Sequence, residues 1–588
     1  MRLFLLLTAL AAALAQNPAP VPAQDARNAN IPNTDTHFTM PAYPNLAAWE
    51  ARKLVLKRQI LFAAGLDPMP EKSPLHPQVF GRTDAKDYTI DKVLLETLPG
   101  YYLGGNLYRP KGRTGKFPAI ASPHGHWNYG RLEHAPLNSI PTRCINLARQ
   151  GYVVLAYDMV GYNDTAQTPH AFGGRSEQLW GFGPLGLQLW NSIRVVDFLA
   201  SLDEVDAARI GATGASGGGT QTFLLAAVDD RIQFDAPVNM VSAIMQGGSP
   251  CENAPGLRVG AFNVEFAAMM APRPMLLVSA TGDWTRNMLK EEHPAIRHIY
   301  ELYDRVANVE AVQIDAPHNY NQASREAVYR FFARKVLGDD DQARYKEQSV
   351  RVEKLQDMLA LHGRTLPAGA LNYDGLFTQW KRNAGRQLEA IQDKATRKRL
   401  LQQAVGAEWP AQVVDQTTGD RIVLSRPGVG DRVPGLWFPG KGKPVLVVHE
   451  LGAQAALPGA ELAKARAAGR PVLAIDVFQT GSAKTNRNKP HAHLLTFNRS
   501  DDALRAQDIL TALAWLESKT GQRPELIGLE AGAVWARFAA AVAPGPVQLQ
   551  AAATTFQGTD QELGAAFLVP GIQRAGGWKS ALALTANQ

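Results

Sequence analysis

The chain has 588 residues, of which 45% are apolar and 20% are charged. At roughly 150 residues a domain, this length predicts two to four domains and excludes a single small binding module. The apolar fraction supplies ample material for packed cores and excludes wholesale disorder. The net charge of +7 is modest for the length, and the sequence has no dense basic stripe with interleaved aromatic residues, so no nucleic-acid partner is expected.

The first fifteen residues have the pattern of a secretory signal peptide. Arg2 supplies the positive start, residues 3–12 form an apolar run, and Ala13-Leu14-Ala15 is a small-x-small cleavage site. We expect cleavage after Ala15 and a secreted or periplasmic protein. The alternative is an uncleaved anchor, but the apolar run is shorter than the roughly twenty residues that span a bilayer. We therefore expect no membrane association after cleavage.

Cys144 and Cys251 are the two cysteines of the chain. A large exported protein with two cysteines does not depend on a disulfide framework. The sequence leaves open whether they are paired or free. They do not form a C-x-x-C zinc pair either.

Residues 16–80 form a Pro-rich leader followed by a helix over Leu46–Gly65. Residues 81–338 alternate apolar runs with helical stretches, which predicts an α/β domain with a mostly parallel sheet of eight strands and helices on both faces. Ligands in such a sheet gather beyond the carboxyl ends of the strands. The predicted strands are Tyr88–Leu95, Tyr102–Tyr108, Ala119–Ser122, Tyr152–Tyr157, Arg209–Ala212, Phe234–Val238, Pro274–Ser279 and Val309–Ile314.

Residues 339–412 read as a helical connector, because apolar residues there follow helical spacing. Residues 413–588 then repeat the earlier pattern in a shortened form. The segment 106–110 is echoed by 435–439, 122–125 by 447–450, and 156–159 by 474–477. Three echoes in the same order predict a second, truncated copy of the first domain.

A G-x-S-x-G motif is centred on Ser216, between an apolar strand and a run of helix formers. A nucleophilic serine at such a strand-to-helix turn needs glycines two positions to either side, because the turn is very tight. The free amides at the start of the following helix also favour an anion at this place. We therefore predict that Ser216 is a catalytic nucleophile.

A serine nucleophile needs a base that is oriented by an acid, and both follow in the order Ser, Asp, His. Asp283 comes directly after a predicted strand, and His318 lies in the loop after the next one. The rival acids are Asp304, which we expect within a helix, and Asp315, which is only three residues from the base. The alternative roles are a turn or capping aspartate for Asp283 and a surface histidine for His318.

An acyl-transfer intermediate needs two N–H donors for its oxyanion. Gly217 follows the nucleophile and supplies one, and the backbone of Gly125 or His126 supplies the other from the loop after an early strand. The alternative makes His124 and His126 metal ligands, joined by His134 and Asp158. The serine set explains more residues, so we predict no metal and no other cofactor.

Four aromatic residues fall on loops at the predicted active-site end: Trp127, Tyr129, Trp180 and Trp284. They are candidates for a platform that contacts a sugar or aromatic group. The alternative is that they pack a lid.

Several motifs together resemble the exported α/β-hydrolases of the acetyl xylan esterase and dienelactone-hydrolase-like group. They are Gly214-Ala215-Ser216-Gly217-Gly218-Gly219, Gly282-Asp283-Trp284, His318-Asn319-Tyr320 and His124-Gly125-His126. The resemblance covers residues 80–338 and implies an α/β-hydrolase fold and hydrolysis of carboxylic esters through an acyl-enzyme. Two departures concern the substrate: dienelactone hydrolases use a cysteine where this chain has Ser216, and glucuronoyl esterases carry arginine where it has Gly217.

The second copy has Glu530 where the serine would stand, in Gly528-Leu529-Glu530-Ala531-Gly532. No histidine follows His493, and 58 residues follow Glu530, whereas 102 positions separate Ser216 from His318. We therefore predict that residues 413–588 are catalytically silent.

The leading hypothesis is a serine hydrolase that acts on a small ester or an acylated carbohydrate, such as acetylated plant polysaccharide or its fragments. The nearest rival is a peptidase of the prolyl-oligopeptidase type, although the residues before the sheet are too few for a propeller domain. A non-catalytic carbohydrate-binding or scaffold protein is the third possibility. The sequence does not predict the oligomeric state.

Overall fold

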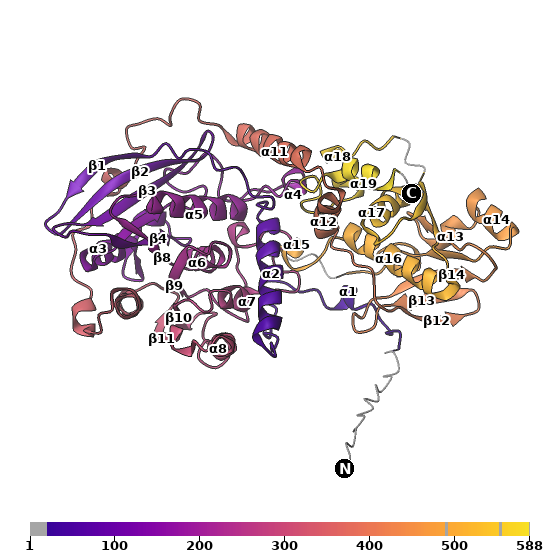
Figure 1. The fold of residues 1–588 in the computed structure, drawn as a ribbon, viewed down its shortest axis with the longest axis horizontal. Helices are drawn as coiled ribbons and strands as arrows, with labels where there is room; N and C mark the ends of the chain where they lie inside the picture. Colours follow the sequence, from indigo (N-terminus) through magenta and orange to yellow (C-terminus); the bar gives the residue numbers. More distant parts are fainter. Residues whose placement is uncertain (1–19, 488–491, 552–554, 587–588) are drawn as a thin grey trace, which may run out of the picture.

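The computed structural model of the chain describes residues 20–487, 492–551 and 555–586. The predicted signal peptide, residues 1–15, lies outside the described residues. Among the helices that are described, none is long and apolar enough to cross a membrane. Two α/β units lie side by side, with helix α2 (Leu46–Ala63) between them (Figure 1).

The first unit is built on a sheet of nine strands in the order β1-β2-β3-β7-β4-β8-β9-β10-β11. The neighbours from β1 to β7 pair antiparallel, and those from β7 to β11 pair parallel. The strands are β1 (Gln78–Asp84), β2 (Tyr88–Leu98), β3 (Tyr101–Pro110), β4 (Phe117–Pro123), β7 (Val153–Tyr157), β8 (Val205–Ala215), β9 (Ile232–Val238), β10 (Met275–Gly282) and β11 (Val309–Pro317). All eight predicted strands are confirmed.

The ninth strand, β1, is missing from the prediction. It is an edge strand with a mostly exposed sequence, Gln78–Asp84, so it lacks the apolar run that marks the central strands.

Helices cover both faces of this sheet because neighbouring residues of each strand point to opposite sides. In β4, Ala119 and Ala121 belong to one core and Ile120 to the other. The first core also contains residues of α2, α5, α6, α7 and α8, and the second contains residues of α3 and α9. These helices are α3 (Ile140–Gln150), α5 (Pro184–Ala200), α6 (Gly217–Val228), α7 (Asn263–Ala268), α8 (Glu292–Leu302) and α9 (Gln322–Phe332).

Residues 339–412 contain helices and no strand, as the sequence predicts. The helices are α10 (Leu355–Met358), α11 (Tyr373–Ala390) and α12 (Lys394–Val405). Trp380 of α11 packs into a core of the first unit, whereas Leu400 and Leu401 of α12 pack into the core of the second. The connector therefore contributes to both units.

The second unit has a sheet of seven strands in the order β12-β13-β14-β16-β15-β17-β18. The strands are β12 (Val414–Thr418), β13 (Arg421–Ser425), β14 (Val433–Phe438), β15 (Val445–His449), β16 (Val472–Ile475), β17 (Glu525–Leu529) and β18 (Gln548–Ala551). The helices are α13 (Ala453–Ala456), α14 (Ala460–Ala467), α15 (Leu494–Phe497), α16 (Asp501–Thr520), α17 (Gly532–Val542), α18 (Asp560–Ala566) and α19 (Gly577–Thr585).

The seven strands of the second sheet have the same order and directions as the first seven strands across the first sheet, from β1 to β9. Its first three pairs are antiparallel and its next three are parallel, which is the sequence of directions from β1 to β9. The chain order is also the same, because β15 and β16 exchange places in the sheet just as β4 and β7 do. Strands equivalent to β10 and β11 are absent from this seven-stranded sheet.

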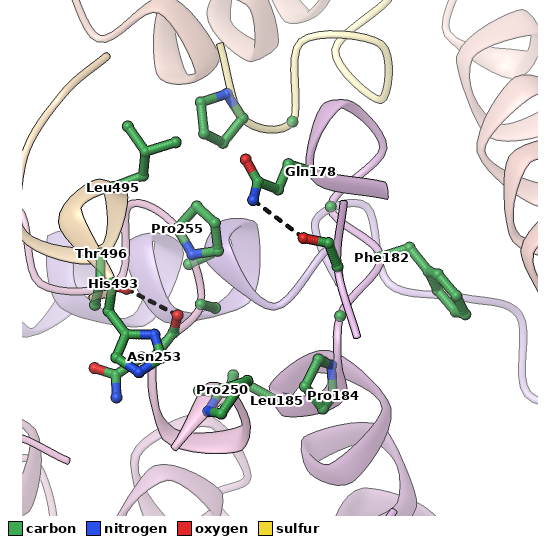
Figure 2. A pocket seen from close by; sticks show the side chains of 18 of the residues that line it. Gln178, Phe182, Pro184, Leu185, Pro250, Asn253, Pro255, His493, Leu495 and Thr496 are labelled. Atoms are coloured by element: carbon green, nitrogen blue, oxygen red, sulfur yellow. Dashed lines mark hydrogen bonds between the residues drawn. The ribbon is translucent and has the colours of Figure 1, made fainter. Parts of the chain in front are cut away.

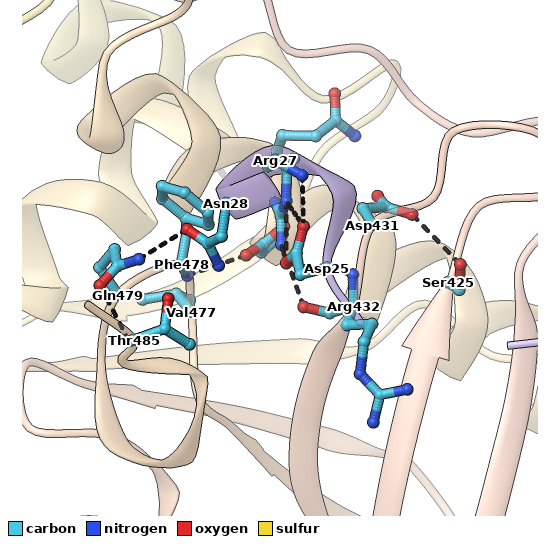
Figure 3. A network of polar contacts seen from close by, with 12 residues as sticks. Asp25, Arg27, Asn28, Ser425, Asp431, Arg432, Val477, Phe478, Gln479 and Thr485 are labelled. Atoms are coloured by element: carbon cyan, nitrogen blue, oxygen red, sulfur yellow. Dashed lines mark hydrogen bonds and ion pairs between the residues drawn. The ribbon is translucent and has the colours of Figure 1, made fainter. Parts of the chain in front are cut away.

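The N-terminal segment packs against the second unit, although it precedes the first sheet in the chain. On α1 (Ala26–Ala29), Arg27 bonds Asp508 at 2.6 Å, and Asn28 accepts a hydrogen bond from Gln479 (Figure 3). Arg27 also donates to the Arg432 carbonyl oxygen. Further along the leader, the Thr34 hydroxyl donates to the Gly247 carbonyl oxygen of the first unit. The leader therefore contacts both units.

Candidate active site

Ser216 stands at a strained turn between β8 and α6. Its backbone has φ +58° and ψ −129°, which an L-residue adopts only at a cost. A Cβ on Gly214 would lie 2.5 Å from the Pro123 carbonyl oxygen, and one on Gly218 would lie 2.7 Å from the same atom. Both flanking positions therefore require glycine, which is the geometry of a nucleophile elbow.

Asp283 and His318 form a hydrogen-bonded pair beyond the ends of β10 and β11. Nδ1 of His318 lies 2.8 Å from Oδ2 of Asp283. The other carboxylate oxygen accepts hydrogen bonds from the Thr285 amide at 2.7 Å and from its hydroxyl at 2.5 Å. Asp283 is buried and held from both sides, so it fixes the orientation of the imidazole.

Neither rival acid occupies this position. Asp315 is bonded to the Thr281 hydroxyl at 2.6 Å in an exposed place. Asp304 was expected within a helix, and this expectation is wrong: α8 ends at Leu302, and Asp304 follows with φ +54°.

Contacts through Gly125 and Trp127 connect the elbow to His318. A Cβ on Gly125 would lie 2.9 Å from Cβ of Ser216 and 3.2 Å from Nε1 of Trp127. The Trp127 ring stacks on His318 with centroids 6.0 Å apart, and Trp284 lies on it at 4.4 Å. Nε2 of His318 is buried, and no group among the described residues bonds it. This nitrogen is therefore not committed to another group of the described chain.

The other two predicted aromatic contacts lie elsewhere. Tyr129 is 54% exposed at the rim of this loop. Trp180 follows α4 (Arg175–Leu179), and its indole donates to Asp560 of the second unit at 2.8 Å. The structure therefore brings Trp127 and Trp284 to His318, and places Trp180 at the junction of the units.

The predicted oxyanion donors, Gly217 and the loop 124–126, lie next to Ser216. Gly217 is the first residue of α6, and its amide belongs to the helix turn that has no intrahelical acceptor. The ring of His126 lies against Gly217, because a Cβ on Gly217 would lie 2.7 Å from Cε1 of His126. Gly125 lies close to the Ser216 side chain, because a Cβ on Gly125 would lie 2.9 Å from Cβ of Ser216.

The alternative hypothesis of a metal site is not supported, because its proposed ligands do not come together. They are His124, His126, His134 and Asp158. His124 is buried and uses both ring nitrogens, one with the Gly125 carbonyl oxygen and one with the Met159 amide. Burial lowers its pKa to about 3, so the ring is neutral. His134 bonds Ser139, and Asp158 forms a buried ion pair with Arg131.

His126 has different partners from those expected. Its Nε2 lies 3.0 Å from Sγ of Cys251 and 3.1 Å from Nε2 of His170. Both cysteines are free thiols and both are buried. Sequence reasoning missed His170 and Cys251 because no local motif marks them, and 44 and 125 positions separate them from His126.

The second unit keeps the strained elbow without the nucleophile. Glu530 has φ +50°, and Gly528 and Gly532 flank it. Glu450 occupies the position that corresponds to Gly125, and its carboxylate accepts a hydrogen bond of 3.4 Å from the Ala531 amide. The Glu450 carboxylate is thus hydrogen-bonded to the amide of the residue after Glu530, which corresponds in position to Gly217 of the first unit.

A cavity of about 290 Å³ lies between the two units (Figure 2). Phe182 and Pro250 line it from the first unit, and His493 and Leu495 from the second. Thr496 closes one side through a 2.8 Å hydrogen bond to the Asn253 carbonyl oxygen. The second unit therefore forms one wall next to the loop that carries Cys251.

The sheet order and the strained elbow define an α/β-hydrolase. The profile of the family "Acetyl xylan esterase (AXE1)" matches residues 69–240. A solved structure named "Methylesterase BT1017" is 32% identical with a TM-score of 0.52, over 59% of this chain and 78% of that one. "Putative hydrolase YtaP" of Bacillus subtilis (strain 168) is 26% identical over 246 residues, which are 39% of this chain and 80% of that protein. The chain belongs to the acetyl xylan esterase family of α/β-hydrolases.

Proposed function

We propose that the chain is a serine esterase that cleaves carboxylic esters through an acyl-enzyme on Ser216. The observation that carries the proposal is the pair of the buried Asp283 with the half-buried His318, whose Nε2 has no partner among the described residues, in one unit with the strained turn at Ser216. A non-catalytic scaffold protein would not need both a serine on a strained turn and a histidine that is oriented by an aspartate and has one ring nitrogen without a partner.

The chemistry follows from these groups. His318 accepts the Ser216 proton through Nε2 as the hydroxyl oxygen attacks the ester carbonyl. Asp283 holds the Nδ1–H tautomer and stabilises the imidazolium that forms. The amides of Gly217 and of Gly125 or His126 donate to the oxyanion, and each donor contributes on the order of a hundredfold in rate.

Acylation ends when His318 gives its proton to the leaving alkoxide, so the alcohol departs and the acyl group remains on Ser216. Deacylation uses the same groups with water in place of the alcohol. His318 removes a proton from water, which attacks the acyl carbonyl, and then gives that proton to the Ser216 oxygen as the acid leaves.

The substrate class we favour is an acylated carbohydrate, in which acetate is the acyl group. The family profile supports this choice. A second candidate is the methyl ester of a sugar acid, which the 32% identical methylesterase supports. Trp127 and Tyr129 lie on the loop next to Gly125, and both can contact a sugar ring.

Hydrolysis of short-chain p-nitrophenyl esters by the mature chain tests the reaction class. Ser216→Ala should lose at least about a thousandfold in kcat, whereas Ser201→Ala, at an exposed helix end, should keep full activity. Acetylated xylan fragments and methyl-esterified pectin then separate the substrates, because one releases acetate and the other methanol. Equal rates for Ser216→Ala and the unchanged chain would overturn the proposal.

The same assay separates the rival functions. A prolyl-oligopeptidase-like enzyme would cleave a proline-containing peptide amide faster than any ester, and a carbohydrate-binding scaffold would bind xylan without releasing acid. The described residues before the first sheet form α1, α2 and loops, which supports the esterase over a peptidase with a propeller. We also propose that the protein is exported, as a secreted or periplasmic enzyme.

For the second unit we propose a silent copy of the hydrolase, residues 413–588, that packs against the loops of the first unit that carry Trp180 and Asn253. Its support is the repeated sheet order, Glu530 at the elbow, and the hydrogen bonds of Asp560 with Trp180 and of Thr496 with Asn253. Glu530→Ser in a Ser216→Ala background should restore no hydrolysis, since the described sheet of this unit ends at β18 and no histidine follows Glu530 in the sequence. Restored activity would contradict this role.

A further inference from the structure

His126, His170 and Cys251 bring three metal-ligating atoms together beside the proposed oxyanion site. Nε2 of His126, Nε2 of His170 and Sγ of Cys251 all lie within 4.8 Å of one another. Cys251 is buried, and the two imidazoles are partly exposed. Among the described residues, no other group of three or more His, Cys, Asp or Glu side chains brings its ligand atoms this close together.

The spacing is close to that of a tetrahedral site. Zinc bound to nitrogen at about 2.0–2.1 Å and to sulfur at about 2.3 Å sets neighbouring ligand atoms roughly 3.3–3.6 Å apart. In the structure, His126 Nε2 lies 3.1 Å from Nε2 of His170 and 3.0 Å from Sγ of Cys251. Side-chain shifts of a few tenths of an ångström, on the order of ordinary thermal displacement, would make room for an ion.

The tautomer of His170 is set for coordination. Its Nδ1 lies 2.6 Å from the Val160 carbonyl oxygen, which can only accept, so Nδ1 carries the proton. The lone pair of a neutral ring then lies on Nε2 and points to the other two groups. A second-sphere carbonyl of this kind is the usual partner of a metal-bound imidazole.

Hydrogen bonds satisfy the cluster in one arrangement, in which His126 donates from Nε2 to Nε2 of His170 and the Cys251 thiol donates to the Ser249 hydroxyl at 3.5 Å. If the thiol donates to Nε2 of His126 instead, two imidazole lone pairs face each other across 3.1 Å. A cation between the three atoms would use both imidazole lone pairs and the thiolate at once.

Neighbouring rings hold the arrangement in place. His126 and His170 are edge to face with centroids 5.0 Å apart, and Tyr162 packs on His170 at 5.1 Å. The Ser249 hydroxyl lies 3.4 Å from Nε2 of His170 and 3.5 Å from Sγ of Cys251. The site therefore has a polar group next to its open side.

We propose that His126, His170 and Cys251 bind one divalent ion of the zinc class through Nε2, Nε2 and Sγ. Two imidazoles and a thiolate suit zinc or cobalt rather than calcium or magnesium, which prefer oxygen ligands. Binding breaks the S–H bond of Cys251, forms a sulfur–metal bond and releases one proton to solvent, without a change of oxidation state. One coordination position stays open for water or an anionic group.

The site would act on the catalytic loop through His126. Its ring covers the α-carbon of Gly217, and its backbone is a candidate oxyanion donor. A bound ion would hold this ring, and with it the loop 124–127, in one position. This consequence rests on the proposed esterase function, whereas metal binding itself does not.

The test uses the full mature chain, stripped with a chelator and titrated with Co²⁺ under reducing conditions. We expect one cobalt per chain, with a thiolate-to-cobalt charge-transfer band and the visible bands of a tetrahedral ion. Dialysis against zinc followed by elemental analysis should retain one zinc per chain.

Variants identify the ligands. Cys251→Ser should lose the charge-transfer band, and His170→Ala should weaken binding by at least about tenfold to a hundredfold. Cys144→Ser is the matched control, because Cys144 is the other buried thiol and lies near Ser122 instead. It should leave stoichiometry and spectrum unchanged.

Three results would overturn the proposal: no stoichiometric cobalt or zinc on the unchanged chain, a band that persists in Cys251→Ser, or one that disappears in Cys144→Ser. His170→Ala gives an independent answer if Cys251→Ser does not fold. Because the readout is bound metal, failure here is distinguishable from failure of the esterase proposal, which is read by ester hydrolysis.

Discussion

Asp283 uses one carboxylate oxygen for Thr285 and the other for Nδ1 of His318, at 2.8 Å. This division makes the aspartate an orienting group, because neither oxygen is free to turn toward substrate. Its burial further strengthens the bond to the imidazole. The first prediction follows from this arrangement.

Asp283→Asn should lower kcat for ester hydrolysis by about 10³–10⁴, because an amide nitrogen facing Nδ1 would favour the wrong imidazole tautomer. Steady-state kinetics on p-nitrophenyl acetate measure the loss, and circular dichroism checks the fold. Asp315→Asn, at the exposed rival acid, is the control and should retain full activity. If kcat falls less in Asp283→Asn than in Asp315→Asn, then Asp315 and not Asp283 is the acid that orients His318.

Trp284 positions His318, since its ring lies 4.4 Å from the imidazole, and Trp127 stacks on the same imidazole at 6.0 Å. Trp284→Ala should reduce kcat by on the order of tenfold to a hundredfold, the cost of a base displaced by about an ångström. Trp284→Phe should recover most of the lost kcat, because a smaller aromatic ring still packs on the imidazole. An unchanged kcat in Trp284→Ala would show that this ring does not position His318.

Asp235 carries a buried carboxyl group in β9, and neither of its oxygens has a hydrogen-bond partner among the described residues. Burial therefore raises its pKa well above the usual value. Between the unfolded and the folded pKa the native state binds more protons, so the free energy of unfolding falls as pH rises, by about 1.4 kcal/mol per pH unit. This contribution of Asp235 to the free energy of unfolding is fully present below the unfolded pKa of about 4, and it is lost as the pH rises toward the folded pKa.

Asp235→Asn should remove this slope and make the variant more stable than the unchanged chain at pH 8, while the two converge near pH 4. Urea unfolding followed at several pH values measures it. Asp340→Asn, at an exposed position, should not alter the slope. Parallel profiles for the unchanged chain and Asp235→Asn would show that the buried carboxyl does not titrate as proposed.

The sequence predicted those features whose signals are local. Ser216, Asp283 and His318 each follow an apolar run that is a strand, and the glycines at 214 and 218 reveal the tight turn. The shortened repeat was visible for the same reason, because its three echoes fall on β14, β15 and β16.

Features that depend on contacts between distant segments were not predictable. The candidate metal ligands come together from three loops, and no spacing rule connects them. Trp180 was predicted as a site residue because it falls on a loop at the predicted active-site end, but its hydrogen-bond partner, Asp560, lies 380 positions away in the sequence. Strand β1 was missed because its exposed edge carries little apolar signal.

The elbow of the second unit places a glutamate, Glu530, on a strained backbone. Glu530 has φ +50° and an exposed side chain, and its carboxylate has no hydrogen bond in the described part of the chain that substitution would remove. A left-handed backbone costs a residue with a Cβ about 1–2 kcal/mol, whereas glycine adopts it freely but loses more entropy on folding.

Glu530→Gly should therefore stabilise the second unit by up to about 1 kcal/mol, or about 2–4 °C in its thermal midpoint. Differential scanning calorimetry measures the shift, and ester hydrolysis should be unchanged. Glu461→Gly makes the same chemical change in the right-handed helix α14 and should destabilise the unit by about 1 kcal/mol. Because strain relief predicts opposite signs for the two variants, a loss of stability in both would mean that Glu530 makes a stabilising contribution greater than the cost of its backbone.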